Sequence, residues 1–255
     1  MKKCIAIGGI VVFVIGIAFL LWIFLGNRDT SVGNKTYKGT ISREDSSLSF
    51  YDTIELPETN IINEVGVKYG KYDIFKDDKE KEYVFVHEED IYCGFRTLNT
   101  DSSEATIEED GAKEIATEYL KKEVSNSSVY QLEDTVYQEW NYSYLVRFRH
   151  YIEEIPTEEV VEISVGGNGI VNSYSNFMAG CFDQTSVDAG VVKEAMETIK
   201  GQLEKEYTSK NYKINEQGIT YQDGKLVLKT AYFYKKEQGD GASIMMDNLI
   251  YTPLS

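Results

Sequence analysis

The chain is poor in the side chains that carry most acid–base and metal chemistry near neutral pH. Its 255 residues include 2 histidines and 3 cysteines, and both histidines, His87 and His150, lie in segments with strand-like alternation. His87-Glu88 begins like the His-Glu-x-x-His zinc motif, but isoleucine stands at position 91. No Gly-x-x-x-x-Gly-Lys-Ser/Thr phosphate loop occurs. We therefore predict no catalytic residue, no cofactor, no metal site and no enzymatic activity.

Positive charge is also scarce. The chain has 26 lysines and arginines against 42 aspartates and glutamates, a net charge of −16. Without Lys2 and Lys3, which precede the first apolar segment, 24 basic residues face the same 42 acidic ones, a net charge of −18. A domain with this charge is repelled by phosphate backbones, which excludes nucleic acid as a partner. Acidic runs such as Asp77-Asp78-Lys79-Glu80 lack the EF-hand spacing, and we interpret them as solvated turns.

Charge is absent altogether from residues 4–25, which read CIAIGGIVVFVIGIAFLLWIFL. At about 1.5 Å of helical rise per residue, this segment is long enough to cross a hydrocarbon core of roughly 30 Å. A cleaved signal peptide has a shorter apolar core followed by a small-x-small site, whereas the nearest such site, Ser31-Val32-Gly33, lies well beyond the run. We predict a transmembrane signal anchor over residues 1–26 that contacts the lipid bilayer through residues 4–25.

The basic residues around this segment bear on its orientation. Lys2, Lys3 and the amino terminus favour a cytoplasmic N-terminus, because short basic tails usually stay inside. The other flank weakens this bias, since it also carries Arg28, Lys35, Lys38 and Arg43. We predict that the protein crosses the cell membrane once and that its C-terminal domain is extracytoplasmic.

Cys93 and Cys181 are the cysteines that follow the predicted anchor. An oxidising exterior would permit a disulfide between them. Two cysteines at unrelated spacings do not distinguish this pairing from a pair of buried free thiols, and both interpretations stay open.

The rest of the chain divides by pattern. Residues 27–45 are short of large apolar groups and are predicted to be a linker. Residues 46–100 contain short runs of alternating apolar and polar residues, typical of a small antiparallel β region.

Beyond this region the pattern changes to the helical period twice. One apolar face is formed by Ala112, Ile115, Ala116, Tyr119 and Leu120, and a second by Val192, Ala195, Met196, Ile199 and Leu203. Thr106 with Glu109, and Thr185 with Asp188, have the spacing of capping boxes.

Each helical pattern is followed by three strand patterns, and Gly166-Gly167-Asn168-Gly169 is typical of a hairpin turn. We predict an α+β fold in which antiparallel sheets are each packed by one amphipathic helix, in units spanning residues 104–178 and 185–255. The repeated order is that expected of an internal duplication.

The segments IEEDGAKEIATEYLKK (107–122) and YLVRFRHYIEEIPTEEVVEISVGGNGIVNSYS (144–175) resemble the PepSY domain family of extracytoplasmic proteins in Gram-positive bacteria. In that family an acidic-capped helix with an Ala-x-x-Ile-Ala core packs on an antiparallel sheet, and a Gly/Asn hairpin precedes the last strand. Residues 112–116 and 166–169 fill these roles here, and residues 187–254 resemble the pattern more loosely. The resemblance implies two PepSY-like units that inhibit or regulate peptidases, or bind other envelope proteins. The sequence shows no protease pattern after these units, so we expect regulation of a separate peptidase and not of one in the same chain.

The chain also contains 19 tyrosines, mostly on predicted strands, and Trp140 lies just before the strand predicted to begin at Tyr144. Strand propensity alone accounts for many of them. Aromatic residues and arginine are nevertheless enriched where proteins bind partners, and we predict partner contact at Trp140, Tyr144 and Arg147.

The sequence thus predicts a non-catalytic, membrane-anchored binding or regulatory module that engages an envelope protein or peptidase. The alternatives are a structural or assembly component of a membrane complex and, third, a hydrolase that uses paired carboxylates.

Overall fold

The computed structural model describes residues 41–64, 66–98, 106–124, 126–152, 154–183, 185–208, 211–237 and 243–254. The predicted signal anchor, residues 1–26, lies outside these ranges. Among the described residues, no helix combines the length and the apolar character that crossing a bilayer requires.

The first part of the sheet is an antiparallel set of four strands. β1 (Ser49–Glu55) pairs with β4 (Lys71–Lys76), which pairs with β5 (Glu82–Val86), which pairs with β6 (Tyr92–Arg96). Between β1 and β4 lie a short 3-10 helix, η1 (Pro57–Thr59), and the two-residue strands β2 (Ile61–Ile62) and β3 (Lys68–Tyr69). Three residues of the predicted linker already belong to this packed region, because Ile41 contacts its core and Ser42 and Arg43 are buried.

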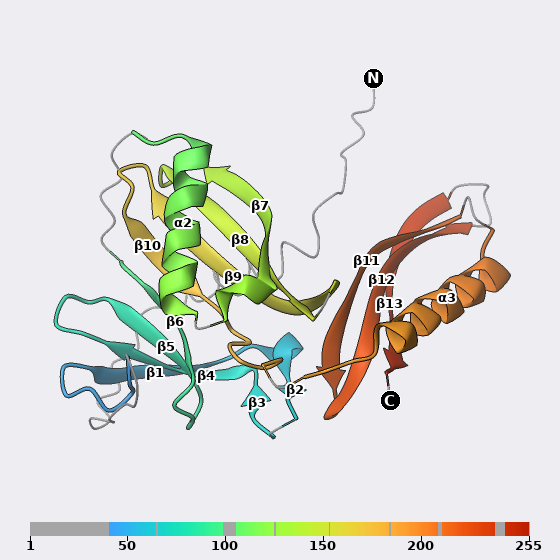
Figure 1. Cartoon of the computed structure of the whole chain (residues 1–255), viewed down its shortest axis with the longest axis horizontal. Helices are drawn as coiled ribbons and strands as arrows, with labels where there is room; N and C mark the ends of the chain where they lie inside the picture. The colour runs from blue at the N-terminus through green and yellow to red at the C-terminus, as the bar shows by residue number, and fades with distance from the viewer. Residues whose placement is uncertain are drawn as a thin grey trace.

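The same sheet continues into the central part of the chain. β6 pairs with β10 (Val171–Ser175), and the order then runs through β9 (Ile155–Gly166) and β8 (Ser143–Ile152) to the edge strand β7 (Tyr130–Gln138). Helix α2 (Glu109–Glu123) lies across this group of strands (Figure 1), and the 3-10 helix η2 (Ser127–Val129) leads from it into β7.

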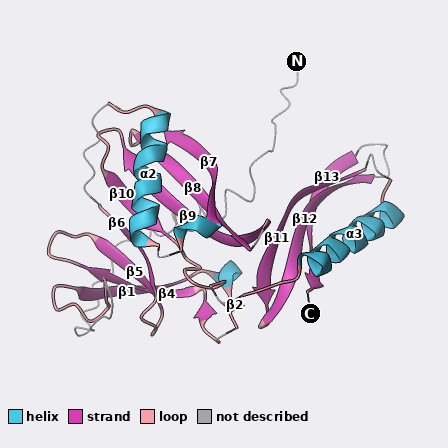
Figure 2. Ribbon diagram, in the orientation of Figure 1, coloured by secondary structure: helices cyan, strands magenta, loops and turns pink. Residues whose placement is uncertain are grey.

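A second helix and sheet follow. α3 (Ala189–Glu206) precedes the antiparallel strands β11 (Tyr212–Gln222), β12 (Lys225–Glu237) and β13 (Ser243–Pro253). The two parts of the sheet meet where Ile219 of β11 pairs in parallel with Thr157 near the start of β9. Figure 2 shows α3 alongside these three strands and away from α2.

The apolar faces predicted for both helices are confirmed. Ala112, Ala116 and Leu120 are buried above Val146, Phe148 and Val161 of the sheet. The buried residues of α3 contact the β11–β13 sheet and the segment after β10; they are Val192, Ala195, Ile199 and Leu203. The described chain is therefore an α+β protein with a mostly antiparallel sheet and two packed helices, as the periodicity predicts.

Both predicted capping boxes are wrong in detail. α2 is preceded by Glu108, whose side chain makes no capping hydrogen bond, and the Thr106 hydroxyl instead donates to the Gly167 carbonyl oxygen at 2.7 Å. Asp188 is the residue that caps α3, since its carboxylate accepts from the Gly190 N–H at 2.6 Å. Thr185 bonds to the Tyr221 hydroxyl. Tertiary partners thus bind the two threonine hydroxyls that the capping-box spacing assigns to the helix N-termini.

The predicted hairpin at residues 166–169 is confirmed. Its turn is closed by hydrogen bonds from the Gly169 N–H to the Gly166 carbonyl and from the Gly166 N–H to the Ile170 carbonyl, both 2.8 Å. Gly169 has φ +79, a left-handed conformation that favours glycine. The strand β7, by contrast, is absent from the sequence prediction, because its polar run contains Gln131, Glu133 and Asp134.

Candidate functional site

The turn between β7 and β8 is held rigidly. The Ser143 hydroxyl lies 3.1 Å from Gln138 Oε1 and 2.8 Å from Asn141 Oδ1. Tyr142 adopts φ 49, and its carbonyl oxygen accepts a 2.7 Å hydrogen bond from the Gly167 N–H of the neighbouring β9–β10 turn. The two turns are therefore tied together at one end of the sheet.

Aromatic side chains gather on this turn and on the ends of β7 and β8 beside it, and we call this group the aromatic end: Tyr137, Trp140, Tyr142 and Tyr144. Trp140 is 70 % exposed, an unusual state for tryptophan. Tyr137 and Tyr142 are also exposed, and the rings of Tyr137 and Tyr144 lie 5.0 Å apart between centroids. Rings held on a rigid turn lose little conformational freedom when a partner covers them, which favours binding.

Arg147, the third predicted contact residue, has a different environment. Its side chain is 13 % exposed and lies between Asp134 of β7 at 2.9 Å and Glu162 of β9 at 2.8 Å. Burial disfavours the charged form, but hydrogen bonds and attraction from both carboxylates outweigh it and raise the pKa of Arg147. Because side chains alternate along a strand, Arg147 also lies on the sheet face opposite that of Tyr144. The structure thus leaves Trp140 exposed on the turn, packs Tyr144 partly against the apolar cluster beneath α2, and places Arg147 between two carboxylates.

The strand β7 borders the aromatic end and forms an edge of the sheet, since it pairs with β8 on one side and ends the strand order on the other. Leu132 and Val136 are exposed along it. A bulge between Leu132 and Asp134 interrupts its register with β8. Sequence reasoning missed this strand. The available signal was the Thr135-Val136-Tyr137 run, which has high strand propensity.

A fully buried carboxyl group lies on the α2 side of the sheet. Oε1 of Glu159 accepts hydrogen bonds from the Tyr130 hydroxyl at 2.5 Å and from the Asn176 amide at 2.7 Å, whereas its Oε2 has no hydrogen-bond partner. Burial raises the pKa of Glu159 to about 7, against the opposing effect of these two hydrogen bonds. Because the group is sealed from solvent, it is a structural acid whose charge costs stability.

The two histidines hold structural positions. Asp73 is buried and accepts hydrogen bonds from Arg43 at 2.8 Å and Thr53 at 2.8 Å, with His87 Nδ1 at 2.7 Å. Burial opposes the charged form of Asp73, but the hydrogen bonds lower its pKa. One of these hydrogen bonds attaches Arg43, which precedes β1, to Asp73 of β4. The other ring nitrogen of His87 lies 3.6 Å from the Glu88 carboxylate.

His150 is buried, with its Nδ1 3.2 Å from the Thr157 hydroxyl. Burial lowers the pKa of His150 and so favours its neutral form. The rings of Tyr130 and Phe182 lie beside the imidazole, with centroids 5.2 Å and 5.8 Å from its own.

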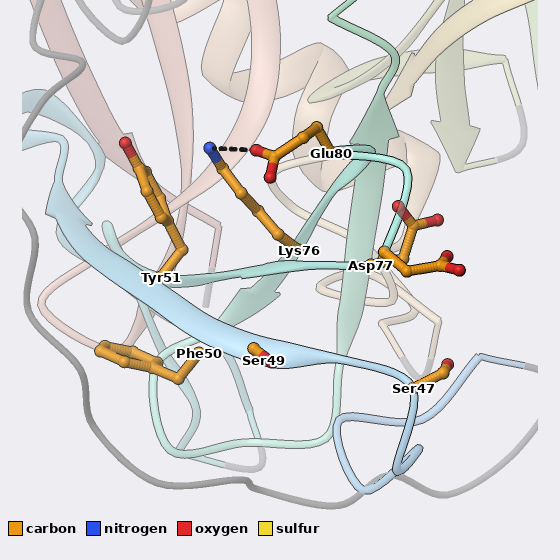
Figure 3. Close-up of a pocket in the computed structure, with 8 residues that line it drawn as sticks. Ser47, Ser49, Phe50, Tyr51, Lys76, Asp77 and Glu80 are labelled. Atoms are coloured by element: carbon orange, nitrogen blue, oxygen red, sulfur yellow. Dashed lines mark hydrogen bonds and ion pairs between the residues drawn. The ribbon is translucent and has the colours of Figure 1, made fainter.

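A shallow polar pocket of about 320 Å³ lies between β1 and the β4–β5 turn (Figure 3). Lys76 extends over the Tyr51 ring, with Nζ 3.7 Å from the centroid, and pairs with Glu80 at 3.2 Å. Asp77 accepts from the backbone N–H groups of Lys79 and Lys81, both at 2.9 Å. The charged groups thus satisfy one another, and this acidic run forms a turn as its composition predicts.

Cys93 and Cys181 are buried and carry free thiols in the structure. Burial raises the pKa of both thiols far above the ordinary value, so they are held in the unreactive protonated form. Within the described ranges, no three His, Cys, Asp or Glu side chains come together in a way that could hold a metal ion.

Comparisons with known proteins find little. No protein-family model matches the chain, and no curated protein matches it. Among solved structures, the Bacillus megaterium YpeB C-terminal domain matches with a TM-score of 0.39 and 13 % sequence identity, covering 80 % of this chain and 91 % of that chain. A likeness at this level carries no inference about function.

Proposed function

We propose that this chain is a membrane-anchored, extracytoplasmic binding module without catalytic activity, built from two PepSY-like units, and that it engages an envelope protein through the aromatic end. The observation that carries the proposal is Trp140, 70 % exposed on a turn that side-chain and backbone hydrogen bonds hold in place. Large exposed aromatic groups on rigid elements are typical anchor residues of protein interfaces.

We include Tyr144 in this surface because its ring lies beside the turn, tilted against that of Tyr137 with the centroids 5.0 Å apart. Arg147 contributes indirectly in this proposal. Its ion pairs with Asp134 and Glu162 join β7, β8 and β9 and so fix the strand that carries Tyr144. The aromatic side chains of the surface favour a partner with an apolar contact patch, and the exposed Glu139 beside Trp140 places one negative charge at its border.

The residues that resemble the PepSY family support a peptidase as the partner. The alternative is a subunit of a membrane complex to which the domain binds without changing any activity.

The test is site-specific crosslinking in living cells. A photo-crosslinking amino acid replaces Trp140 in the full chain, and a matched variant carries it at Val191, which is exposed on α3. We expect a crosslinked protein at position 140 that is missing at position 191. No product at 140, or the same products at both positions, would exclude the aromatic end.

The identity of the captured protein separates the two partner classes. A peptidase whose turnover changes on addition of the full chain supports regulation. Recovery of membrane-complex subunits alone supports the assembly role instead.

A further inference from the structure

Three strands form free edges of the described sheet, and they differ in how they are protected. β1 pairs with β4 across a bulge between Phe50 and Asp52, and β7 pairs with β8 across a bulge between Leu132 and Asp134. β13 pairs with β12 over all eleven of its residues without a shift of register. Bulges and charges are the usual means by which proteins prevent edge strands from pairing with other chains.

The three edge strands also differ in how many charged residues they contain. β1 contains Asp52 and Glu55, and β7 contains Glu133 and Asp134, whereas Asp247 is the one charged residue of β13. Met245 is 61 % exposed and Leu249 45 %, and Ile244 and Tyr251 are exposed as well. A regular, eleven-residue, largely apolar edge of this kind is suited to accept another strand.

The strand is complementary to itself when two copies run antiparallel about Asn248. Each residue then faces a residue of the same sheet face in the other copy, because opposed positions differ by an even number. Met245 faces Tyr251, and Met246 faces Ile250. Asp247 faces Leu249 and not a second Asp247, so the one charge of the strand does not oppose itself directly.

This register also uses the whole strand, since its ends Ser243 and Pro253 are equally distant from Asn248. The pairing would extend over about 36 Å, at roughly 3.3 Å per residue.

We propose that β13 is the interface of a homodimer, in which it pairs antiparallel with β13 of a second copy and joins the two β11–β13 sheets into one. Ile250 contacts the apolar cluster beneath α3, so the α3 faces of the two copies lie on the same side of the joined sheet. The proposal uses neither the aromatic end nor the membrane anchor.

Oligomeric mass tests this interface. The full chain, purified in detergent, is compared with Met245→Lys/Tyr251→Lys, which places lysines directly opposite each other in the proposed register, and with Leu132→Lys, a charged substitution on the β7 edge. We expect the wild type and the β7 variant to have the mass of two chains and the β13 variant at least a tenfold higher dimer dissociation constant. Circular dichroism checks that all three are folded.

Cysteine crosslinking tests the register. Asn248→Cys and Leu132→Cys are each made in a Cys4→Ser background, where the remaining cysteines are buried. Opposed residues in an antiparallel pair have Cα atoms about 4.5–5.5 Å apart, which suits a disulfide. We expect a disulfide-linked dimer on oxidation for position 248 and none for position 132. A wild-type chain that is monomeric at tens of micromolar, or a dimer that survives the β13 lysines, would overturn the proposal.

Discussion

Trp140 and Arg147 lie seven positions apart in the sequence and have opposite surroundings. Trp140 projects from a turn into solvent, whereas the guanidinium group of Arg147 is almost covered and contacts two carboxylates. The same aromatic and basic pattern therefore contains one residue suited to contact a partner and one that stabilises the sheet.

Their substitutions should separate binding from stability. Trp140→Ala removes exposed surface, so we expect an unchanged free energy of unfolding and at least a tenfold loss of partner binding. Arg147→Ala leaves Glu162 without its cation in a poorly solvated position, which should cost about 1–3 kcal/mol of stability. Urea unfolding and partner pull-down, measured on both variants, check this. The assignment is wrong if Arg147→Ala is as stable as the wild type.

Glu159 makes stability depend on pH. Its pKa of about 7 in the folded chain lies above the ordinary value of 4.5, so the folded state binds the proton more tightly than the unfolded state. This contribution is complete below about pH 4.5 and is lost as the pH rises through 7. The difference corresponds to about 3 kcal/mol.

Glu159→Gln keeps an acceptor oxygen for Tyr130 and Asn176 but cannot lose a proton. We expect it to gain about 3 kcal/mol relative to the wild type between pH 5 and pH 9, measured by urea unfolding at both values. Glu114→Gln, at an exposed position of α2, serves as the control and should keep the wild-type slope. An unchanged slope in Glu159→Gln would contradict the role of the buried acid.

At the scale of elements, the pairing of β6 with β10 is the junction that joins the N-terminal strands to the helix-covered strands. Gly94 occupies this junction with φ +143, and a Cβ atom there would lie 2.0 Å from the Tyr174 carbonyl oxygen. The backbones approach so closely that glycine is required.

Gly94→Ala should therefore prevent the two strands from pairing and leave the chain unfolded or aggregated, as judged by circular dichroism and size-exclusion chromatography. The matched variant is Gly201→Ala, inside α3, where an added Cβ meets nothing within 4 Å. Because alanine favours the helix over glycine, this second change should stabilise the chain by up to about 1 kcal/mol. A folded, stable Gly94→Ala protein would contradict the junction.

At the scale of the whole molecule, the two helix-covered parts are joined by several contacts. β9 pairs with β11 at Thr157, Arg149 lies 3.2 Å from Glu216, and Lys229 pairs with Glu158. Apolar residues of both parts also share one cluster, which contains Ile152, Phe182 and Ile219. These contacts give the described chain a common core, so we expect it to unfold cooperatively.

The proposed membrane topology is tested on intact cells that make the full chain. If the C-terminal domain is extracytoplasmic, added protease should digest it while a cytoplasmic marker protein survives. Detergent permeabilisation is the control that exposes both. Survival of the domain beside a digested surface protein would show the inverted orientation.

Local periodicity was enough to predict the two amphipathic helices, the hairpin at residues 166–169 and the α+β class, because these depend on residues close together in the chain. The enrichment of aromatic residues at interfaces named Trp140 as a contact candidate, whereas nothing in the sequence predicted the ion pairs of Arg147. Those pairs come from neighbouring strands, Asp134 and Glu162, which are 13 and 15 residues away.

Only the tertiary structure decided how the elements combine. The β6–β10 and β9–β11 pairings join segments that share no local pattern, and the burial of Glu159 depends on Tyr130 and Asn176 from other strands and loops. The hydrogen bonds of the Thr106 hydroxyl to the Gly167 carbonyl oxygen and of the Thr185 hydroxyl to Tyr221 also join distant segments. Such contacts form between segments that are far apart in the chain. Their free energy depends on that long-range pairing, so the spacing of neighbouring residues does not predict them.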